Sequence, residues 1–458
     1  MKNAPFKQRS IIGRAFDRLV RRLRPRENRS IREDIRKTPK PEVTETLAAQ
    51  MKRVERCLAS LDNKVACQKH LKPVLEGYLD LDDDDRYRWM QLVVGEFDID
   101  TEDLHDKMIV YLSTHRRDLL GPIREQMTPP WERLLEHMHL APGGLEFLFG
   151  LRADLLRLKN DGDALDGLDR ILRRLISLRF HSELPGFRRI FRSDLPRLMK
   201  SLVDCGALHE THSPEQLESR LDSDHYCFAL FHPNMPDDPL LFGLVALVDG
   251  TPDNIHDLLD DTLSMSASDA GRTVTLYSVS RVRAGLEGIG LENLLAERIV
   301  DELDTHFGEP DACVALAPIP GFRDHVRTLV SGDPTPLLSP EEAEELRELL
   351  KIGIREQEHE ILESSKLFQP MLSRLCAHYL LHEQDGQAAA DPVAHFHLSG
   401  GASIDRINWL GDHSPTGMNQ SFGIMANYRY TPSELRDNRE KYVLDGEIRH
   451  SSGIRGLL

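Results

Sequence analysis

The sequence has few of the residues that mark membrane, disulfide-rich or metal-binding proteins. Its six cysteines are scattered over 458 residues without a CxxC pair, and no apolar run approaches the roughly 18 residues of a membrane span. Aromatic residues make up only 6% of the chain, but 40% of it is apolar, which is too much for a disordered polymer. Scattered single thiols are typical of reduced, mostly buried cysteines, so we expect an intracellular protein of two or three domains.

Positive charge is scarce over most of the chain. Lys and Arg number 58 against 75 Asp and Glu, for a formal net charge of −17. This balance argues against a nucleic-acid-binding protein, which needs a basic surface. Residues 1–40 are the exception, because they hold 14 basic and four acidic side chains; their formal charge is +10, which leaves −27 for the rest.

Apolar residues between Ile11 and Leu23 recur at helical spacing among the arginines of this basic N-terminal arm. Such a helix could be an organellar presequence, a membrane-surface anchor or a dock for an acidic partner. The four acids are unusual for a transit peptide and favour a solvated tail. We therefore expect a cytoplasmic protein, with the mitochondrial matrix as the alternative compartment.

Residues 41–190 form the first of two halves that differ in their apolar pattern. Leu, Val, Ile and Met recur there at steps of three and four, with charge on the opposite face, which predicts an all-helical bundle. The predicted helices are 43–61, 65–81, 86–96, 102–119 and 145–158. Breaks between helices are expected at Asp82–Asp85, Pro129-Pro130 and Pro142–Gly144, and the acidic run is interpreted as a solvated face.

Residues 191–458 interleave strand-like and helical patterns. Apolar runs at 226–231 and 240–248, joined by a turn, predict a pair of strands. Further strands are expected at 273–280, 313–316 and 404–410, and helices at 291–306, 340–364 and 371–382. The alternation predicts an α/β or α+β domain after the helical one.

Three segments of this second half could carry chemistry. The first, at 281–290, is a glycine-rich turn between a predicted strand and a predicted helix, where backbone amides could bind a phosphate and Arg281 and Arg283 could add charge. A turn that binds nothing fits the same pattern. The second is Ala-Pro-Ile-Pro-Gly-Phe at 317–322, a rigid turn after a strand, which is a good place to present a ligand group.

The third segment contains His395 and His397. If it is extended, the two rings share one face, which would suit a metal, but no third ligand is placed nearby by the sequence, so we expect no metal. A single histidine acting as acid or base is the more economical role, and a buried structural histidine is the alternative.

From about Leu145 to the C-terminus, the chain resembles the malonyl-CoA decarboxylase family. The resemblance rests on ordered motifs, the densest of which are Cys-Phe-Ala-Leu-Phe-His-Pro at 227–233, Pro-Ile-Pro-Gly-Phe at 318–322, Leu-Cys-Ala-His-Tyr-Leu at 375–380, Asp-Pro-Val-Ala-His-Phe-His-Leu at 391–398, Arg-Ile-Asn-Trp-Leu at 406–410 and Ser-Phe-Gly-Ile-Met-Ala-Asn-Tyr at 421–428. So many motifs in one order over some 300 residues make chance an insufficient explanation.

The resemblance implies a multidomain α and α/β (α+β) protein. It implies a helical oligomerisation domain over 41–190 and an acetyltransferase-like (GNAT-like) catalytic domain with a mixed sheet over 191–458. The implied reaction is the decarboxylation of malonyl-CoA to acetyl-CoA and CO2, without an organic cofactor. The implied partners are this substrate and product, and further copies of the chain in a homo-oligomer; neither nucleic acid nor a membrane span is expected.

The resemblance also implies the site residues. His397 matches the family's proton donor to the enolate. The loop that contacts coenzyme A maps onto Glu287, Gly288, Ile289, Gly290, Leu291, Glu292 and Asn293, and position 317 belongs to the substrate site.

Two of these residues depart from the family pattern. Ala317 stands where the family usually has a serine that partners the histidine or the substrate carboxylate. Glu292 stands where a small glycine is usual, and a carboxylate there would repel the pyrophosphate of coenzyme A. Three readings follow: a malonyl-CoA decarboxylase with reduced activity, a related acyl-CoA enzyme with a shifted substrate, or a catalytically silent coenzyme A-binding regulator.

Overall fold

The computed structural model describes residues 44–159, 165–207, 213–221, 225–259, 272–307, 312–352 and 356–458. The basic arm, residues 1–40, therefore lies outside the described residues. The chain divides into two compact units, with the boundary after Ile176, and each is considered by itself. None of the described helices is long and apolar enough to cross a membrane.

The first unit is helical, as predicted. Its helices are α3 (Glu45–Leu58), α4 (Lys64–Leu79), α5 (Asp83–Glu96), α6 (Thr101–Thr114), the 3-10 turn η1 (Arg117–Leu119), α7 (Leu120–Gln126), α8 (Pro130–Leu140), α9 (Gly144–Leu158) and most of α10 (Asp166–Ser182). Tyr78 packs edge-on against Trp89 and Phe147, with ring centroids 4.9 and 5.3 Å apart, so α4, α5 and α9 share an aromatic core.

The acidic run at 82–85 does not separate two helices as a loop, which corrects the prediction. Asp82 is the N-cap of α5, and its side chain accepts a hydrogen bond from the amide of Asp85. The other three aspartates lie in the first turn, where negative charge is favoured by the helix dipole.

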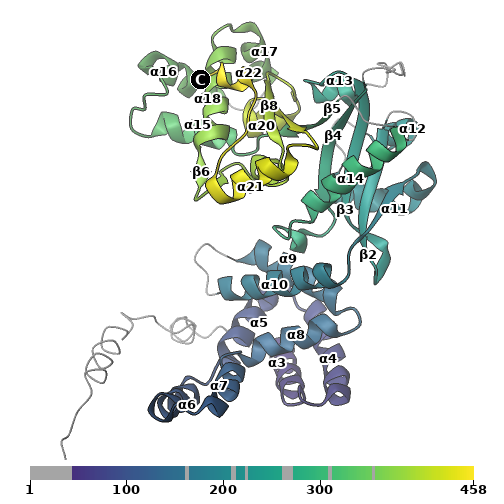
Figure 1. Ribbon diagram of the computed structural model, residues 1–458, viewed down its shortest axis with the longest axis vertical. Helices are drawn as coiled ribbons and strands as arrows, with labels where there is room; N and C mark the ends of the chain where they lie inside the picture. The colour runs from purple at the N-terminus through teal and green to yellow at the C-terminus, as the bar shows by residue number, and fades with distance from the viewer. Residues whose placement is uncertain are drawn as a thin grey trace, which may run out of the picture. The chain divides into compact units, whose positions relative to one another are not determined.

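The second unit is built on a seven-stranded mixed sheet (Figure 1). In spatial order the strands are β1 (Gly186–Ile190), β2 (His225–His232), β3 (Met235–Asp249), β4 (Arg272–Arg281), β5 (Ala312–Pro318), β9 (Met425–Tyr430) and β8 (Ser403–Asn408). Every neighbouring pair is antiparallel except β4 and β5. The sequence missed β1 and β9 and placed the other five.

Helices flank this sheet and follow its strands. They are η2 (Arg192–Asp194), α11 (Leu195–Asp204), α12 (Pro214–Arg220), α13 (Ile255–Leu259), η3 (Ala284–Leu286), α14 (Leu291–Phe307), α15 (Phe322–Ser331), α16 (Pro340–Ile352), α17 (Glu356–Ser364), α18 (Phe368–His382), α19 (Pro392–Ser399), α20 (Pro415–Ser421), α21 (Leu435–Asp445) and α22 (Ser452–Arg455). A two-stranded ribbon, β6 (Gln384–Asp385) with β7 (Ala388–Ala389), precedes α19. The single helix expected over 340–364 is described as two, α16 and α17.

The parallel strands β4 and β5 position the site. β4 and β5 are paired from Thr273 with Ala312 to Leu276 with Ala315, and no further. β4 continues to Arg281 and β5 to Pro318. Beyond Leu276 and Ala315, the two strands therefore no longer pair with each other. A space between neighbouring strands opens where the pairing ends.

The cysteines agree with the prediction. All six are free; five are buried and Cys205 is half-buried. Burial raises the pKa of the Cys57 and Cys313 thiols to about 12, so both are protonated at neutral pH.

Candidate active site

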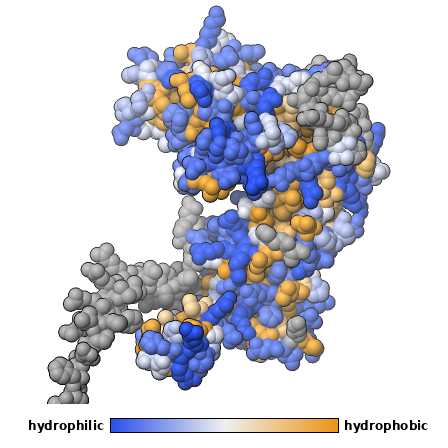
Figure 2. All heavy atoms as spheres, viewed as in Figure 1, coloured by the Kyte–Doolittle hydropathy of each residue, from blue (hydrophilic) through white to orange (hydrophobic). Residues whose placement is uncertain are grey.

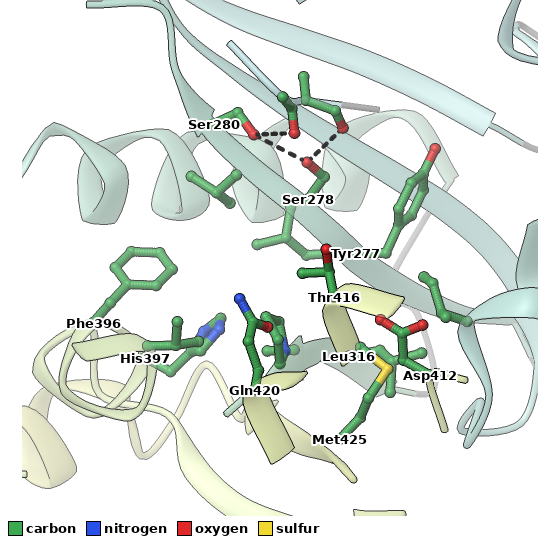
Figure 3. Close-up of a pocket in the computed structure, with 18 of the residues that line it drawn as sticks. Tyr277, Ser278, Ser280, Leu316, Phe396, His397, Asp412, Thr416, Gln420 and Met425 are labelled. Carbon is green, nitrogen blue, oxygen red and sulfur yellow. Dashed lines mark hydrogen bonds between the residues drawn. The ribbon is translucent and has the colours of Figure 1, made fainter. Parts of the chain in front are cut away.

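The space between the ends of β4 and β5 is a cavity of about 430 Å³ (Figure 3). One wall is formed by residues 276–280 of β4 and 316–318 of β5. The facing wall comes from α19 and α20, and Figure 3 shows their His397 and Gln420 below Ser278 and Ser280 of β4. The cavity is therefore bordered by segments from the middle and the C-terminal end of the chain.

His397 reaches this cavity from a helix, so the condition under which His395 and His397 would share a face is not met. Asp391 caps α19 by accepting hydrogen bonds from the amides of Val393 and Ala394, and Pro392 occupies the first turn. Residues two apart on a helix point in different directions. Accordingly, His395 contacts Tyr442 and His397 contacts Tyr430.

The His397 ring is fixed by two tyrosines of β9. Its Nδ1 lies 2.7 Å from Oη of Tyr430, and its face stacks on Tyr428 with ring centroids 4.3 Å apart. The residue is 4% exposed, and burial lowers the pKa of His397 to about 3. The imidazole is therefore uncharged at neutral pH.

Asp391 ties α19 to the turn after β5. Besides capping the helix, its Oδ2 accepts a hydrogen bond from the amide of Gly321 at 3.1 Å. A Cβ at Gly321 would lie 2.2 Å from Oη of Tyr379, so any other residue here would have to displace the Tyr379 ring. The rigid turn predicted at 317–322 thus holds the helix that carries His397; its first residues, Ala317 and Pro318, belong to β5.

Ala317 lines the same cavity, and the hydroxyls of the nearby Ser278 and Ser280 are already engaged with the backbone. Ser278 Oγ donates to the carbonyl of Ala207 at 2.8 Å and lies 3.3 Å from Oγ of Ser280. Ser280 in turn donates to the carbonyl of Gly206 at 3.5 Å. Both serines line the cavity, but these hydrogen bonds direct their hydroxyls to the backbone before α12 (Figure 3).

Sequence reasoning assigned no role to α20, which supplies Thr416 and Gln420 to the cavity. The signal for this helix was present, because Ser414 before Pro415 is a typical N-cap. The Ser414 hydroxyl accepts a hydrogen bond from the amide of Gly417 at 3.1 Å. Nothing in the sequence, however, indicates that α20 faces His397.

The predicted coenzyme A loop, 287–293, does not line this cavity. Gly288 and Gly290 have φ of 68° and 84°, and α14 begins directly after them. Arg281 pairs with Glu292 at 2.9 Å. Asn293 donates to Oγ of Ser399 at 3.1 Å, which links the loop to the C-terminal end of α19.

The cavity carries little charge. Its lining within the described residues includes neither Lys nor Arg, and its one carboxylate is Asp412. That carboxylate accepts a hydrogen bond from the amide of Ser414 and lies 3.3 Å from Nε2 of His256. In the described ranges, no three His, Cys, Asp or Glu side chains gather as a metal site would require. A neutral acid–base histidine in a partly apolar cavity suits proton transfer to a reactive carbon.

Two family models match the chain. The model of the malonyl-CoA decarboxylase C-terminal domain covers residues 186–458, and that of the N-terminal domain covers residues 97–180. The curated mitochondrial malonyl-CoA decarboxylase of Anser anser anser is 30% identical over 72% of this chain and 70% of its own length. That of Rattus norvegicus is 30% identical over 73% of this chain and 72% of its own length.

Solved structures agree with these matches. Malonyl-CoA decarboxylase from Rhodopseudomonas palustris superposes with a TM-score of 0.80 at 26% identity, over 90% of this chain and 100% of that one. The protein of the same name from Agrobacterium vitis has a TM-score of 0.76 at 27% identity, over 90% of this chain and 99% of that one. The family models, the relatives and the shared fold lead to one conclusion: the chain belongs to the malonyl-CoA decarboxylase family.

Proposed function

We propose that this chain decarboxylates malonyl-CoA to acetyl-CoA and CO2, with His397 as the proton donor. The observation that carries the proposal is the setting of His397. Its ring is buried, uncharged at neutral pH and held by Tyr430 at Nδ1, while the residue lines the cavity. When the Tyr430 hydroxyl donates to Nδ1, the single proton of the neutral ring resides on Nε2.

The reaction needs one proton and no external electrons. The bond between the α-carbon and the carboxylate breaks, CO2 leaves, and the electron pair moves to the thioester oxygen as an enolate. The α-carbon then takes the proton from Nε2 of His397, which regains one from water. We therefore propose that neither an organic cofactor nor a metal is needed.

The low charge of the cavity supports this choice of reaction. A malonyl carboxylate that enters it loses water without gaining an ion pair, because the described lining offers no Lys or Arg. The product CO2 is neutral, so it loses little solvation free energy in the same surroundings. Desolvation of the carboxylate therefore favours its departure.

We place the phosphates of coenzyme A at the loop 287–293, as the family resemblance implies. The loop follows β4 and opens α14, and its Asn293 is bonded to Ser399, two residues from His397. His397 and Ser399 both lie in the last turn of α19, so this turn would link the acyl site to the loop that holds the phosphates. An acetyltransferase-like arrangement of the catalytic domain agrees with this placement.

We also propose a homo-oligomer formed through the helical domain, 41–190. On α6, no residue is buried, and Met108, Ile109, Val110 and Leu112 are 43–51% exposed. Figure 2 shows apolar side chains among hydrophilic ones at the surface of this region.

The compartment is proposed to be the cytoplasm; the mitochondrial relatives support the matrix as the alternative.

A second function, that of a silent coenzyme A-binding regulator or of an enzyme for another acyl-CoA, is favoured by one observation. Ala317 lines the cavity without a hydroxyl, which removes one donor and leaves room for a larger acyl group.

The deciding experiment is acetyl-CoA release from malonyl-CoA by the purified full chain. His397→Asn is expected to abolish turnover. His395→Asn is the matched control, because His395 is two residues away but contacts Tyr442 outside the cavity lining. Turnover that survives His397→Asn, or none in the unaltered protein, would contradict the proposal.

A further inference from the structure

Two side-chain nitrogens of the cavity lining have no protein partner within the described residues. One is Nε2 of His397, whose ring is bonded only through Nδ1. The other is the side-chain amide of Gln420, which is half-buried and reaches the cavity from α20. Figure 3 shows both side chains directed into the same space.

We propose that Gln420 is a catalytic residue that donates a hydrogen bond from Nε2 to the thioester oxygen and takes over the role of the hydroxyl missing at Ala317. This inference rests on the proposed decarboxylation. It assigns a function to a residue that neither the family motifs used above nor the spacing of the sequence singled out.

The backbone that carries Gln420 is held firmly. The Ser414 cap fixes the start of α20, and Ser421 Oγ donates to the carbonyl of Ile424 at 2.6 Å at its end. In the middle, the carbonyl of Met418 accepts a hydrogen bond at 2.9 Å from Arg323. Arg323 is itself buried and paired with buried Glu358 at 2.7 Å.

A firmly held helix with one unpartnered amide is the arrangement that a donor to a developing charge requires. The donor needs no rearrangement at the moment of reaction, because its backbone is already fixed. The other polar side chains whose partners are known are already used. Ser278 and Ser280 donate to backbone carbonyls, and Asp412 accepts from the amide of Ser414.

The chemistry of an amide suits this position. As the carbon–carbon bond breaks, negative charge moves from the carboxylate to the thioester oxygen, and a hydrogen bond from Nε2 of Gln420 becomes stronger as that charge grows. The amide keeps its protons, so it does not compete with His397 for the α-carbon. Being uncharged, it also does not hold the carboxylate in the ground state as Lys or Arg would.

The test is the steady-state kinetics of Gln420→Ala beside Asn419→Ala, its matched control. Asn419 is the preceding residue on α20, but it is exposed and does not line the cavity. Loss of one donor to an oxyanion typically costs about 10²–10³ in kcat, so we expect a fall of that size for Gln420→Ala with KM changed less than about threefold. Asn419→Ala is expected to match the unaltered protein.

A second variant guards against a purely steric effect. Gln420→Glu keeps the shape but places a carboxylate beside the enolate, so we expect kcat to fall at least as far as in Gln420→Ala. Thermal unfolding of all three variants is expected to match the unaltered protein within about 2 °C, because the amide has no partner to lose.

A double-mutant cycle with Ala317→Ser tests the exchange of roles. If the amide replaces the hydroxyl, then the serine raises kcat more in the Gln420→Ala background than in the unaltered chain. A kcat for Gln420→Ala within twofold of the unaltered protein, together with loss of turnover in His397→Asn, would overturn this inference and leave the proposed function standing. Absence of His397-dependent turnover in the unaltered chain would overturn both.

Discussion

Arg281 Nη1 lies 2.9 Å from Oε1 of Glu292, which joins the end of β4 to the first turn of α14 across the predicted coenzyme A loop. Glu292 stands where the family usually has a small glycine. The carboxylate that was expected to repel the phosphates is therefore met by a guanidinium from the end of β4. The charge of Arg281 offsets that of Glu292.

This pair predicts an affinity for coenzyme A that depends on both residues together. In Arg281→Ala the Glu292 carboxylate loses its partner, so we expect acetyl-CoA to bind a few-fold more weakly. In Glu292→Gly the arginine becomes available to a phosphate, so binding is expected to tighten by a similar factor, as is usual for partly exposed charges. The double variant is expected to fall near the unaltered protein. Isothermal titration with acetyl-CoA checks this; equal affinities in all four proteins would place the phosphates elsewhere.

Turnover is expected to show no acid limb from His397 between pH 8 and pH 5. Burial lowers the pKa of His397 to about 3, so the free protein keeps a neutral ring over this whole range. An ordinary histidine would titrate near pH 6.5 and would change kcat/KM across this range, because the charged ring is a stronger proton donor than the neutral one. The profile of kcat/KM against pH distinguishes the two; a His397-dependent change centred near pH 6.5 would contradict the burial argument.

Stability is expected to fall as the pH drops from about 6.5 towards 3. The unfolded chain takes up a proton at His397 in this window, whereas the folded chain, with its lowered pKa, does not. The stabilisation is therefore present above pH 6.5 and lost on acidification. In His397→Asn the free energy of unfolding should depend on pH less steeply, by up to about 1.4 kcal/mol per pH unit. Urea denaturation at pH 7, 6 and 5 measures the slopes, and identical slopes would refute the assignment.

Ala317→Ser is expected to raise kcat at least tenfold. The position lines the cavity, and a hydroxyl there adds a donor where the family usually has one. Ala317→Val adds volume without a donor and should give no gain, so it separates polarity from packing. If serine also gives no gain, then the site does not use a hydroxyl at this position.

Tyr430→Phe is expected to lower kcat about tenfold to a hundredfold with little change in KM. The variant keeps the ring but loses the contact with Nδ1 of His397, which fixes the tautomer and orientation of the imidazole. Tyr442→Phe is the matched control, because its hydroxyl contacts Nδ1 of His395 at 2.8 Å in the same way. Equal effects of the two variants on kcat would mean that Tyr430 acts only through packing.

Much of the architecture follows from local sequence patterns. The continuous apolar runs of β2 and β3 identify strands buried on both faces, and the predicted helices of the first unit match α3, α4, α5, α6 and α9. β1 was missed because its five residues include two arginines and show only partial burial. β9 was missed because its Asn-Tyr-Arg-Tyr ending does not read as an apolar run, although all but one of its residues are buried.

The site was predicted only in part, for a physical reason. His397 and Ala317 could be named from motifs, and both line the cavity. Gln420 could not be named in this way, because its helix α20 is held against Arg323 through the carbonyl of Met418, 95 residues away along the chain. No local pattern encodes such a contact. The sequence left the conformation around His397 open; Asp391-Pro392 begins a helix, so the shared face considered for an extended segment does not exist.

The position of β9 in the sheet has a consequence for how the protein is made. β9 lies between β5 and β8, although it is the last strand to be synthesised, and it carries both tyrosines that hold His397. A nascent chain that ends before Met425 therefore has β5 and β8 without the strand that joins them. The cavity that His397 lines can be assembled only after almost the whole polypeptide has left the ribosome, through a late, long-range pairing step.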